Sequence, residues 1–356
     1  MHNPLAKRSL VLDGGFATEL ERSFKKQLPT QLWASSMLYE DPDAVFGVHY
    51  SFFDAGADIV TTSTYQTSFS GFQKAGYDAL STTELLKKAV HLAVKARDMY
   101  WSRSLLEQSM LRDSSSPDTR PPQTCLSQPL VAASLGCYGA SLANGSEYTG
   151  DYNSVSDPEI YKHHLDRIQA MLSQPGVDIL AFESIPKLSE GRVINDLMRK
   201  EGLNVPAWVA YTCKDAENVS HGETFKECVD ALDAQSVIAV GINCTAPALV
   251  KPLLLSLHTS SEPPGFTASA THQPHEYAST NNPHAPKRII VYPNSGESWD
   301  AENKIWLHGN NDPGATAPDF ARLAKEEWIP NGASIIGGCC RTTPEYVREM
   351  KMILTS

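Results

Sequence analysis

The sequence lacks the features that mark membrane, exported and nucleic-acid-binding proteins. No apolar stretch approaches the roughly 20 residues that a helix needs to cross a bilayer, and residues 1–9 lack the apolar centre of a signal peptide. We therefore expect a soluble, cytoplasmic protein with no membrane partner. The 41 acidic residues outnumber the 30 basic ones, and the basic residues are scattered. Nucleic acid is therefore not an expected partner, because it requires a concentrated basic face.

Two motifs are also missing. No G-x-G-x-x-G follows the first predicted strand, which argues against a dinucleotide-binding fold. The seven cysteines form no compact C-x-x-C pair, and their number is odd. In a reducing compartment structural disulfides are not expected, so metal binding, catalysis or burial must account for these thiols.

Apolar, β-branched runs alternate with helical patterns along the chain. Runs such as 237–242 are apolar throughout, which is typical of parallel strands buried on both faces. Eight such strands, each followed by a helix or a long connection, favour an α/β fold of the (β/α)8 TIM-barrel type. The predicted strands are 9–13, 58–63, 130–135, 178–183, 207–212, 237–243, 288–292 and 333–337.

Two stretches interrupt this alternation. Residues 102–128 and 256–287 are rich in Ser, Pro and Thr, and the second also carries several His and Asn residues. They offer too little apolar surface to offset the entropy lost on ordering, so we expect flexible insertions there. The whole chain, 1–356, is then one barrel domain that contains both insertions.

Polar residues gather where the predicted strands end, which is where a (β/α)8 barrel builds its active site. Cys339 and Cys340 end the eighth strand, and Cys244 ends the sixth. Three thiolates suit Zn²⁺, and three protein ligands leave one coordination position open, as in catalytic zinc sites. The alternative is that Cys244 is a buried apolar residue while Cys339 and Cys340 form a redox-active vicinal dithiol.

Seven segments, in order along residues 8–353, resemble the homocysteine S-methyltransferase family, and most closely its sulfonium-dependent members. The resemblance implies a zinc-containing barrel that methylates homocysteine to methionine. The segments are 13–20 (DGGFATEL), 56–66 (GADIVTTSTYQ), 138–140 (YGA), 145–148 (GSEY), 241–244 (GINC), 292–297 (YPNSGE) and 337–342 (GGCCRT).

On this basis we expect one Zn²⁺ per chain, held by Cys244, Cys339 and Cys340, with the homocysteine sulfur in the fourth position. Coordination converts the thiol to the nucleophilic thiolate, which attacks the methyl carbon of S-methylmethionine or S-adenosylmethionine. Two alternatives remain open: a betaine-dependent enzyme, and a non-catalytic zinc-binding or redox-sensing protein. A monomer or small homo-oligomer is expected.

Carboxylates at two strand ends are candidates for binding homocysteine. The resemblance favours Glu183 as the partner of the substrate ammonium group, although a structural ion pair is the alternative. Asp13 is placed near the amino-acid part of homocysteine, where the backbone of Gly14 and Gly15 can approach closely. The alternative for Asp13 is an acidic cap on the following helix.

Other residues in the same segments are assigned to the donor or to the zinc ligands. Tyr65, Tyr138 and Tyr292 present aromatic faces that suit a cationic sulfonium, or are packing residues. Asn243 orients Cys244, binds substrate or satisfies backbone groups in its turn. Cys137 follows the third predicted strand, 130–135, and a packing role is expected for it.

Deleting most of 256–287 is expected to leave methyltransferase activity largely unchanged, because the segment reads as an insertion between the sixth and seventh strands. Steady-state kinetics of the shortened protein check this. A shortened protein that folds but has lost affinity for the methyl donor would show that the segment acts as a lid.

Overall fold

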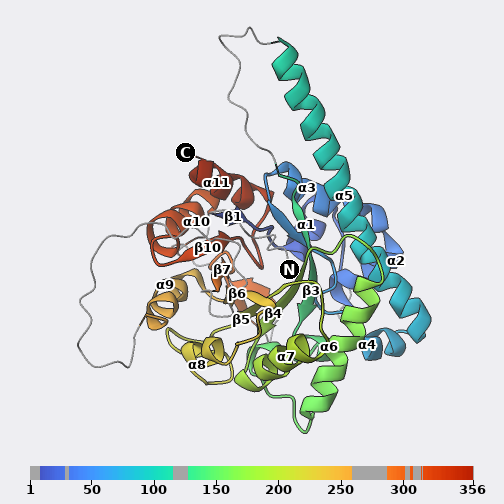
Figure 1. Cartoon of the computed structure of the whole chain (residues 1–356), viewed down its shortest axis with the longest axis vertical. Coiled ribbons are helices and arrows are strands. Elements are labelled where there is room, and N and C mark those ends of the chain that lie inside the picture. Colours follow the sequence, from blue (N-terminus) through green and yellow to red (C-terminus); the bar gives the residue numbers. More distant parts are fainter. Residues whose placement is uncertain are drawn as a thin grey trace.

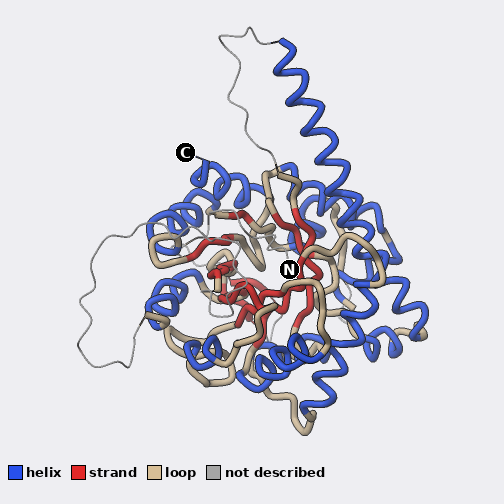
Figure 2. Tube along the Cα trace, viewed as in Figure 1, coloured by secondary structure: helices blue, strands red, loops and turns tan. Residues whose placement is uncertain are grey.

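The computed structural model describes residues 9–28, 32–114, 127–258, 287–300, 305–307, 314 and 316–355. In these parts of the chain, eight parallel strands form a barrel surrounded by helices, which confirms the predicted (β/α)8 fold (Figures 1 and 2). The barrel strands are β1 (Leu10–Val11), β2 (Ile59–Thr61), β3 (Leu130–Gly136), β4 (Ile179–Ile185), β5 (Ala207–Tyr211), β6 (Val237–Asn243), β7 (Arg288–Tyr292) and β10 (Ala333–Ile336).

The strands follow one another around the barrel in chain order, and β10 lies between β7 and β1. A parallel bridge between Leu12 and Ile59 joins the end of β1 to β2, the two strands at opposite ends of the sheet order. Backbone hydrogen bonds from Asp13 to Ile59 (3.1 Å) and from Asp58 to Val11 (2.7 Å) reinforce this junction. A short antiparallel hairpin that the sequence did not predict, β8 (Ser298–Asp300) with β9 (Ile305–Leu307), follows β7.

Helices cover the outside of the barrel. Helix α6 shows how they start: Ser156 and Glu159 form a capping box, and proline stands in the first turn. The α-helices are α1 (Phe16–Ser23), α2 (Met37–Glu40), α3 (Pro42–Asp54), α4 (Phe69–Lys74), α5 (Ala79–Ser114), α6 (Asp157–Leu172), α7 (Leu188–Lys200), α8 (Phe225–Asp230), α9 (Pro247–Ser256), α10 (Ala317–Leu323) and α11 (Pro344–Thr355).

Helix α5 corrects one expectation. A flexible insertion was predicted from residue 102, but α5 continues to Ser114, and its last turns project beyond the barrel in Figure 1. The segment 102–111 contains Leu, Glu, Gln, Met and Arg, which are good helix formers and extend a helix already nucleated over the barrel. Residues 115–126 of the first predicted insertion and residues 259–286 of the second lie outside the described residues.

The alternation of side chains along the strands divides the core into two layers. Alternate residues such as Ala132, Ala181 and Tyr292 fill the barrel interior. The residues between them, such as Leu180 and Phe182, pack against the surrounding helices. If this alternation continues from Ala181, the side chain of Glu183 also points towards the interior, near the carboxyl end of β4.

Close packing between strands fixes one glycine. A Cβ atom on Gly241 of β6 would lie 1.7 Å from the carbonyl oxygen of Ile290 on β7, so only glycine fits there. Gly337, after β10, is similar, because its Cβ would lie 2.6 Å from that of Leu12. The first contact brings β6 close to β7, and the second brings the end of β10 close to the end of β1. No helix in the described residues is long and apolar enough to cross a membrane.

Candidate active site

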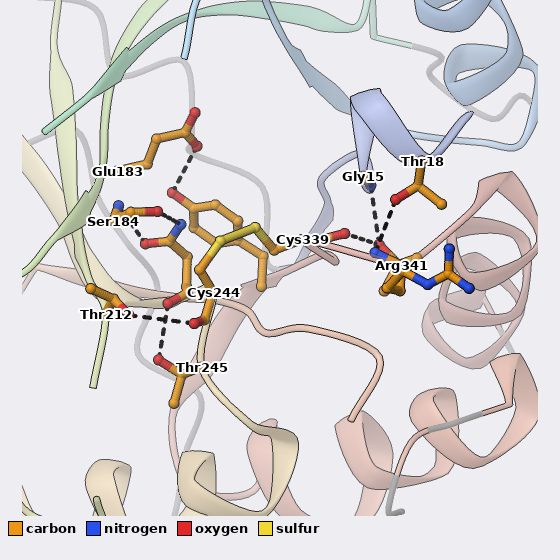
Figure 3. The surroundings of a disulfide bond; sticks show 12 residues. Gly15, Thr18, Glu183, Ser184, Thr212, Cys244, Thr245, Cys339 and Arg341 are labelled. Carbon is orange, nitrogen blue, oxygen red and sulfur yellow. Dashed lines mark hydrogen bonds between the residues drawn. A yellow bond between two sulfur atoms is a disulfide. The ribbon is translucent and has the colours of Figure 1, made fainter. Parts of the chain in front are cut away.

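The three cysteines singled out in the sequence meet at the carboxyl ends of β6 and β10. The Sγ atoms of Cys244, Cys339 and Cys340 all lie within 4.8 Å of one another. In this structure Cys244 and Cys339 are joined by a disulfide, with their Cα atoms 5.6 Å apart, and Cys340 has a free thiol (Figure 3). Once reduced, the three sulfurs are close enough to share one metal ion.

The disulfide corrects one expectation. Only structural disulfides were not expected, and the alternative redox hypothesis paired Cys339 with its neighbour Cys340. The bond instead joins Cys339 to Cys244, which is 95 residues away in the chain. The barrel brings these two strand ends together, whereas Cys340 belongs to the turn in which its carbonyl accepts a hydrogen bond from the backbone of Ser295 (3.1 Å).

Backbone hydrogen bonds to the end of β7 fix both strand ends. The backbone N–H of Cys244 donates to the carbonyl of Tyr292 (3.3 Å), and that of Cys339 donates to the carbonyl of Pro293 (2.8 Å). Cys244 has a φ angle of 46°, in the left-handed region that non-glycine residues rarely occupy. Such strained residues persist where their surroundings fix them, and they gather at functional sites.

The free thiol of Cys340 is held in its neutral form. Burial raises its pKa to about 12, and the nearby negative charges of Glu147 and Glu183 act in the same direction. A thiolate at this position therefore requires a cation beside it. Soft thiolate donors in a group of three fit Zn²⁺.

Glu183 lies beside the cysteine cluster at the end of β4, on the interior face of the barrel. Its two carboxylate oxygens accept hydrogen bonds from Ser134 and from the hydroxyl of Tyr292 (3.2 Å). Tyr292 in turn accepts a hydrogen bond from the indole N–H of Trp208 (3.1 Å). Burial raises the pKa of Glu183 to about 7, although both hydrogen bonds lower it.

Asp13 is the second buried carboxylate. One of its oxygens accepts hydrogen bonds from the backbone N–H (2.7 Å) and the hydroxyl (3.0 Å) of Thr61. Burial raises the pKa of Asp13 well above its usual value, and the charge of Glu183 contributes, so the two carboxylates are near each other. Neither forms an ion pair within the described residues. The structural ion pair considered for Glu183 is therefore not seen, and the two carboxylates can accept one buried cation.

Gly14 and Gly15 lie next to the turn that carries the cysteines. A Cβ on Gly15 would lie 2.7 Å from the carbonyl oxygen of Cys339, and one on Gly14 would lie 2.9 Å from the hydroxyl oxygen of Thr342. The N–H of Gly15 donates to the carbonyl of Thr342 (3.0 Å). In this structure the two glycines therefore allow the loop after β1 to pack against the cysteine turn.

Asn243 holds two strand ends together. Its amide oxygen accepts from the backbone N–H of Ser184 (2.7 Å), and its amide nitrogen donates to the hydroxyl of Ser184 (2.8 Å). Ser184 has a φ of 55°, again in the left-handed region. Because these residues directly precede Cys244 and follow Glu183, the contact couples the position of a zinc-ligand candidate to that of a carboxylate.

The three tyrosines differ in their described contacts. Tyr292 is buried and orients Glu183, as described above. Tyr65 is close enough to Cys137 and Glu147 for their charges to raise its pKa, although burial is the larger cause. The ring of Tyr138 instead contacts Tyr152 and His163, 5.5 and 5.1 Å away between ring centroids, so its described ring contacts lie towards α6.

Cys137 is fully buried in the hydrophobic core, and it is not part of the three-cysteine cluster. This agrees with the packing role expected for it. Cys213 and Cys228 are also buried core residues.

Several residues that shape the site were missed in the sequence. Three residues within strands hold the site residues through hydrogen bonds: Ser134, Ser184 and Trp208. For Ser134 a signal was present, because it is a polar residue within the apolar run 130–136. Trp208 offered none, because a tryptophan in a strand reads as a core residue.

Comparisons with known proteins agree on one family. The family model described as homocysteine S-methyltransferase matches residues 10–354. Homocysteine S-methyltransferase 2 of Arabidopsis thaliana is 36% identical over 342 residues, covering 96% of this chain and 91% of the relative. A selenocysteine methyltransferase of Astragalus bisulcatus is also 36% identical, over 353 residues, covering 99% of this chain and 94% of the relative.

Solved structures show the same similarity. The homocysteine methyltransferase MmuM from Escherichia coli, in its oxidized form, matches with a TM-score of 0.74 and 31% identity, over 99% of this chain and all of MmuM. Its metallated form matches with a TM-score of 0.72 and 31% identity, over 98% of this chain and 96% of MmuM.

The raised pKa of Glu183 predicts a pH-dependent stability difference. Between pH 4.5 and about 7 the folded protein retains a proton that the unfolded chain has released, so this carboxyl lowers stability as pH rises. Without metal and substrate, Glu183→Gln should therefore gain stability relative to wild type, by up to roughly 3 kcal/mol above pH 7 and nothing below pH 4.5. Urea unfolding at several pH values measures this. Glu217→Gln, at an exposed position, is the control, and parallel curves for Glu183→Gln and wild type would contradict the prediction.

Proposed function

The chain belongs to the homocysteine S-methyltransferase family, and from this premise we propose that it transfers a methyl group from a sulfonium compound to homocysteine with zinc at the three cysteines. The donor is S-methylmethionine or S-adenosylmethionine, and the product is methionine. The observation that carries the proposal is the meeting of Cys244, Cys339 and Cys340, from two strand ends, within 4.8 Å.

Zinc, when bound, lowers the pKa of a coordinated thiol so that the sulfur is a thiolate at neutral pH. The protein's part is to supply the three sulfurs in their reduced state. The disulfide between Cys244 and Cys339 and a zinc site at the same cysteines exclude each other, so activity requires a reducing environment.

The pair of buried carboxylates orients the acceptor. Glu183 and Asp13 lie near each other, without an ion-pair partner among the described residues, and an ammonium group would satisfy both. Its positive charge would lower the pKa of each carboxyl, so that both ionise when substrate binds. Holding the ammonium group here and the sulfur at the cysteines fixes the two ends of homocysteine, which brings the sulfur to the donor in a defined orientation.

The methyl transfer itself needs little from the protein. The homocysteine sulfur forms a bond to the methyl carbon while the bond from that carbon to the sulfonium sulfur breaks, and the donor leaves as a neutral thioether. The proton of the homocysteine thiol is already lost on binding. Exclusion of water and in-line alignment are therefore the tasks of the residues around the cysteines.

A selenol acceptor is a second candidate, because the relative from Astragalus bisulcatus is named a selenocysteine methyltransferase. The three sulfurs and the two carboxylates suit an amino acid with a terminal thiol or selenol. Homocysteine and selenocysteine differ in side-chain length, and this difference would distinguish them.

Parallel assays of reduced, zinc-supplied protein test the reaction. Methionine should form from homocysteine with S-methylmethionine, S-adenosylmethionine or both, and not with betaine. Selenocysteine is supplied as a competing acceptor in the same assay. Turnover with betaine alone would contradict the assignment of the donor, and absence of turnover with all three donors would favour a non-catalytic zinc protein.

Removing one cysteine of the cluster should remove the metal. Purified wild-type protein should contain about one zinc per chain, and Cys244→Ala should contain almost none and lose more than about 100-fold in activity, since changes in mere supporting residues already cost 10- to 100-fold. Cys228→Ala, at a buried cysteine outside the cluster, is the matched control. Full activity in zinc-free protein would contradict the mechanism.

A further inference from the structure

A third buried carboxylate near the cysteines has no role in the proposed mechanism. Glu147 belongs to a short 3-10 helix, η3 (Ser146–Tyr148), in the connection between β3 and α6. The residue is only 8% exposed, and its Oε2 atom has no hydrogen-bond partner. Among the described residues it forms no ion pair.

The connection holds Glu147 closely. A Cβ on Gly139 would lie 2.8 Å from the backbone nitrogen of Glu147, so the 3-10 turn at Gly139 packs directly against η3. Backbone hydrogen bonds from Tyr148 to Gly145 (3.0 Å) and from Gly150 to Ser146 (2.8 Å) close η3 on itself. The carboxylate is thus carried by a packed turn.

Glu147 lies close enough to Cys340 and Cys137 for its charge to act on both thiols. Its charge raises the pKa of Cys340 and of Cys137, in each case after burial and one other contribution. The aromatic residues Tyr65 and Tyr148 are close to it as well, because its charge also contributes to raising the pKa of each. The carboxylate, Cys340 and two tyrosines therefore border one region.

The basic side chains near this region are used elsewhere. Arg341, whose charge lowers the pKa of Cys340, forms an ion pair with Glu297. The guanidinium of Arg167 donates to the carbonyls of Gly136 (2.8 Å) and Thr67 (3.3 Å). The ammonium group of Lys187 lies over the ring of Tyr152, 3.6 Å from its centroid. The Oε2 atom of Glu147 is therefore a buried acceptor without a donor among the described residues, an arrangement that costs stability unless a bound group satisfies it.

We propose that Glu147 binds the sulfonium group of the methyl donor, an inference that rests on the proposed function. The acceptor ammonium group has its own carboxylates in Glu183 and Asp13. The donor's methyl carbon must lie next to the acceptor sulfur at the cysteines. The positively charged sulfonium sulfur is bonded to that methyl carbon, so it also lies near the cysteines. A carboxylate beside Cys340 meets this charge, and the faces of Tyr65 and Tyr148 add to the attraction for a cation.

The charge change during the reaction determines which kinetic constant depends on Glu147. The sulfonium is fully positive when bound and becomes a neutral thioether as the methyl group leaves. A carboxylate beside it therefore stabilises the bound donor at least as much as the transition state. Removing the charge should weaken donor binding and leave kcat nearly unchanged or slightly higher.

Glu147→Gln in the zinc-loaded, reduced enzyme tests the proposal. We expect the KM for the sulfonium donor to rise at least about tenfold, the effect of losing one charge-assisted contact, with kcat within about twofold and the KM for homocysteine unchanged. Glu147→Asp, which keeps the charge, should recover part of the donor affinity. Glu217→Gln, which removes an exposed carboxylate, should behave as wild type.

A binding comparison separates the sulfonium from the donor's own ammonium group. Calorimetry with S-methylmethionine and with methionine, which lacks only the methyl group and its charge, should show that Glu147→Gln weakens the first and not the second. Equal weakening of both, a raised KM for homocysteine, or no change in the donor KM would each overturn the proposal. Wild-type protein that binds S-methylmethionine without turnover would overturn the proposed function alone, and wild-type protein that binds neither sulfonium would overturn both.

Discussion

The hydrogen-bonded register of three neighbouring strands, β6, β7 and β10, is the constraint on which the site depends. Ile242 pairs with Val291, and Val291 pairs with Ile336, so β6 and β10 end at the same level on either side of β7. The two cysteines that follow are then 5.6 Å apart between Cα atoms. A slip of one residue in either pairing would turn the side chains to the other face and separate the sulfurs.

The chemistry of the site follows from gathering acidic groups whose pKa values are raised by burial. Arg341, the cation that opposes this at Cys340, is itself paired with Glu297. Three cysteines and the buried carboxyls of Asp13, Glu183 and Glu147 lie in one region, and the pKa values of these carboxyls and of the Cys340 thiol are all raised. Burial alone would hold these groups protonated. A metal ion, an ammonium group and a sulfonium group are the charges that this site lacks, and the proposed reaction brings all three.

The barrel and its cysteines were predictable from the sequence, because both depend on local patterns. Apolar runs such as 237–242 identify buried parallel strands, and the carboxyl ends of such strands lie at one rim, so the sequence indicated that Cys244 and Cys339 could meet there. The carboxylates Glu183 and Asp13 were found by the same argument. The extension of α5 was missed because a Ser- and Pro-rich stretch hid a run of helix formers at its start.

Contacts between distant segments could not be read from the sequence. Tyr138 and Glu147 both lie in the connection after β3, yet the ring of one contacts α6 and the carboxylate of the other lies near Cys340. Which way each side chain turns is set by the packing of that connection against η3 and α6, and no local pattern records it. The pairing of Asn243 with Ser184 is missed for the same reason, since both residues read as ordinary turn residues.

The sulfur coordination of zinc, measured by X-ray absorption at the zinc edge, tests the central claim most directly. The account predicts three sulfur ligands in the reduced, zinc-loaded protein and four after homocysteine is added, with no fourth sulfur when methionine is added instead. A zinc ion whose sulfur coordination does not change when homocysteine is bound would contradict it.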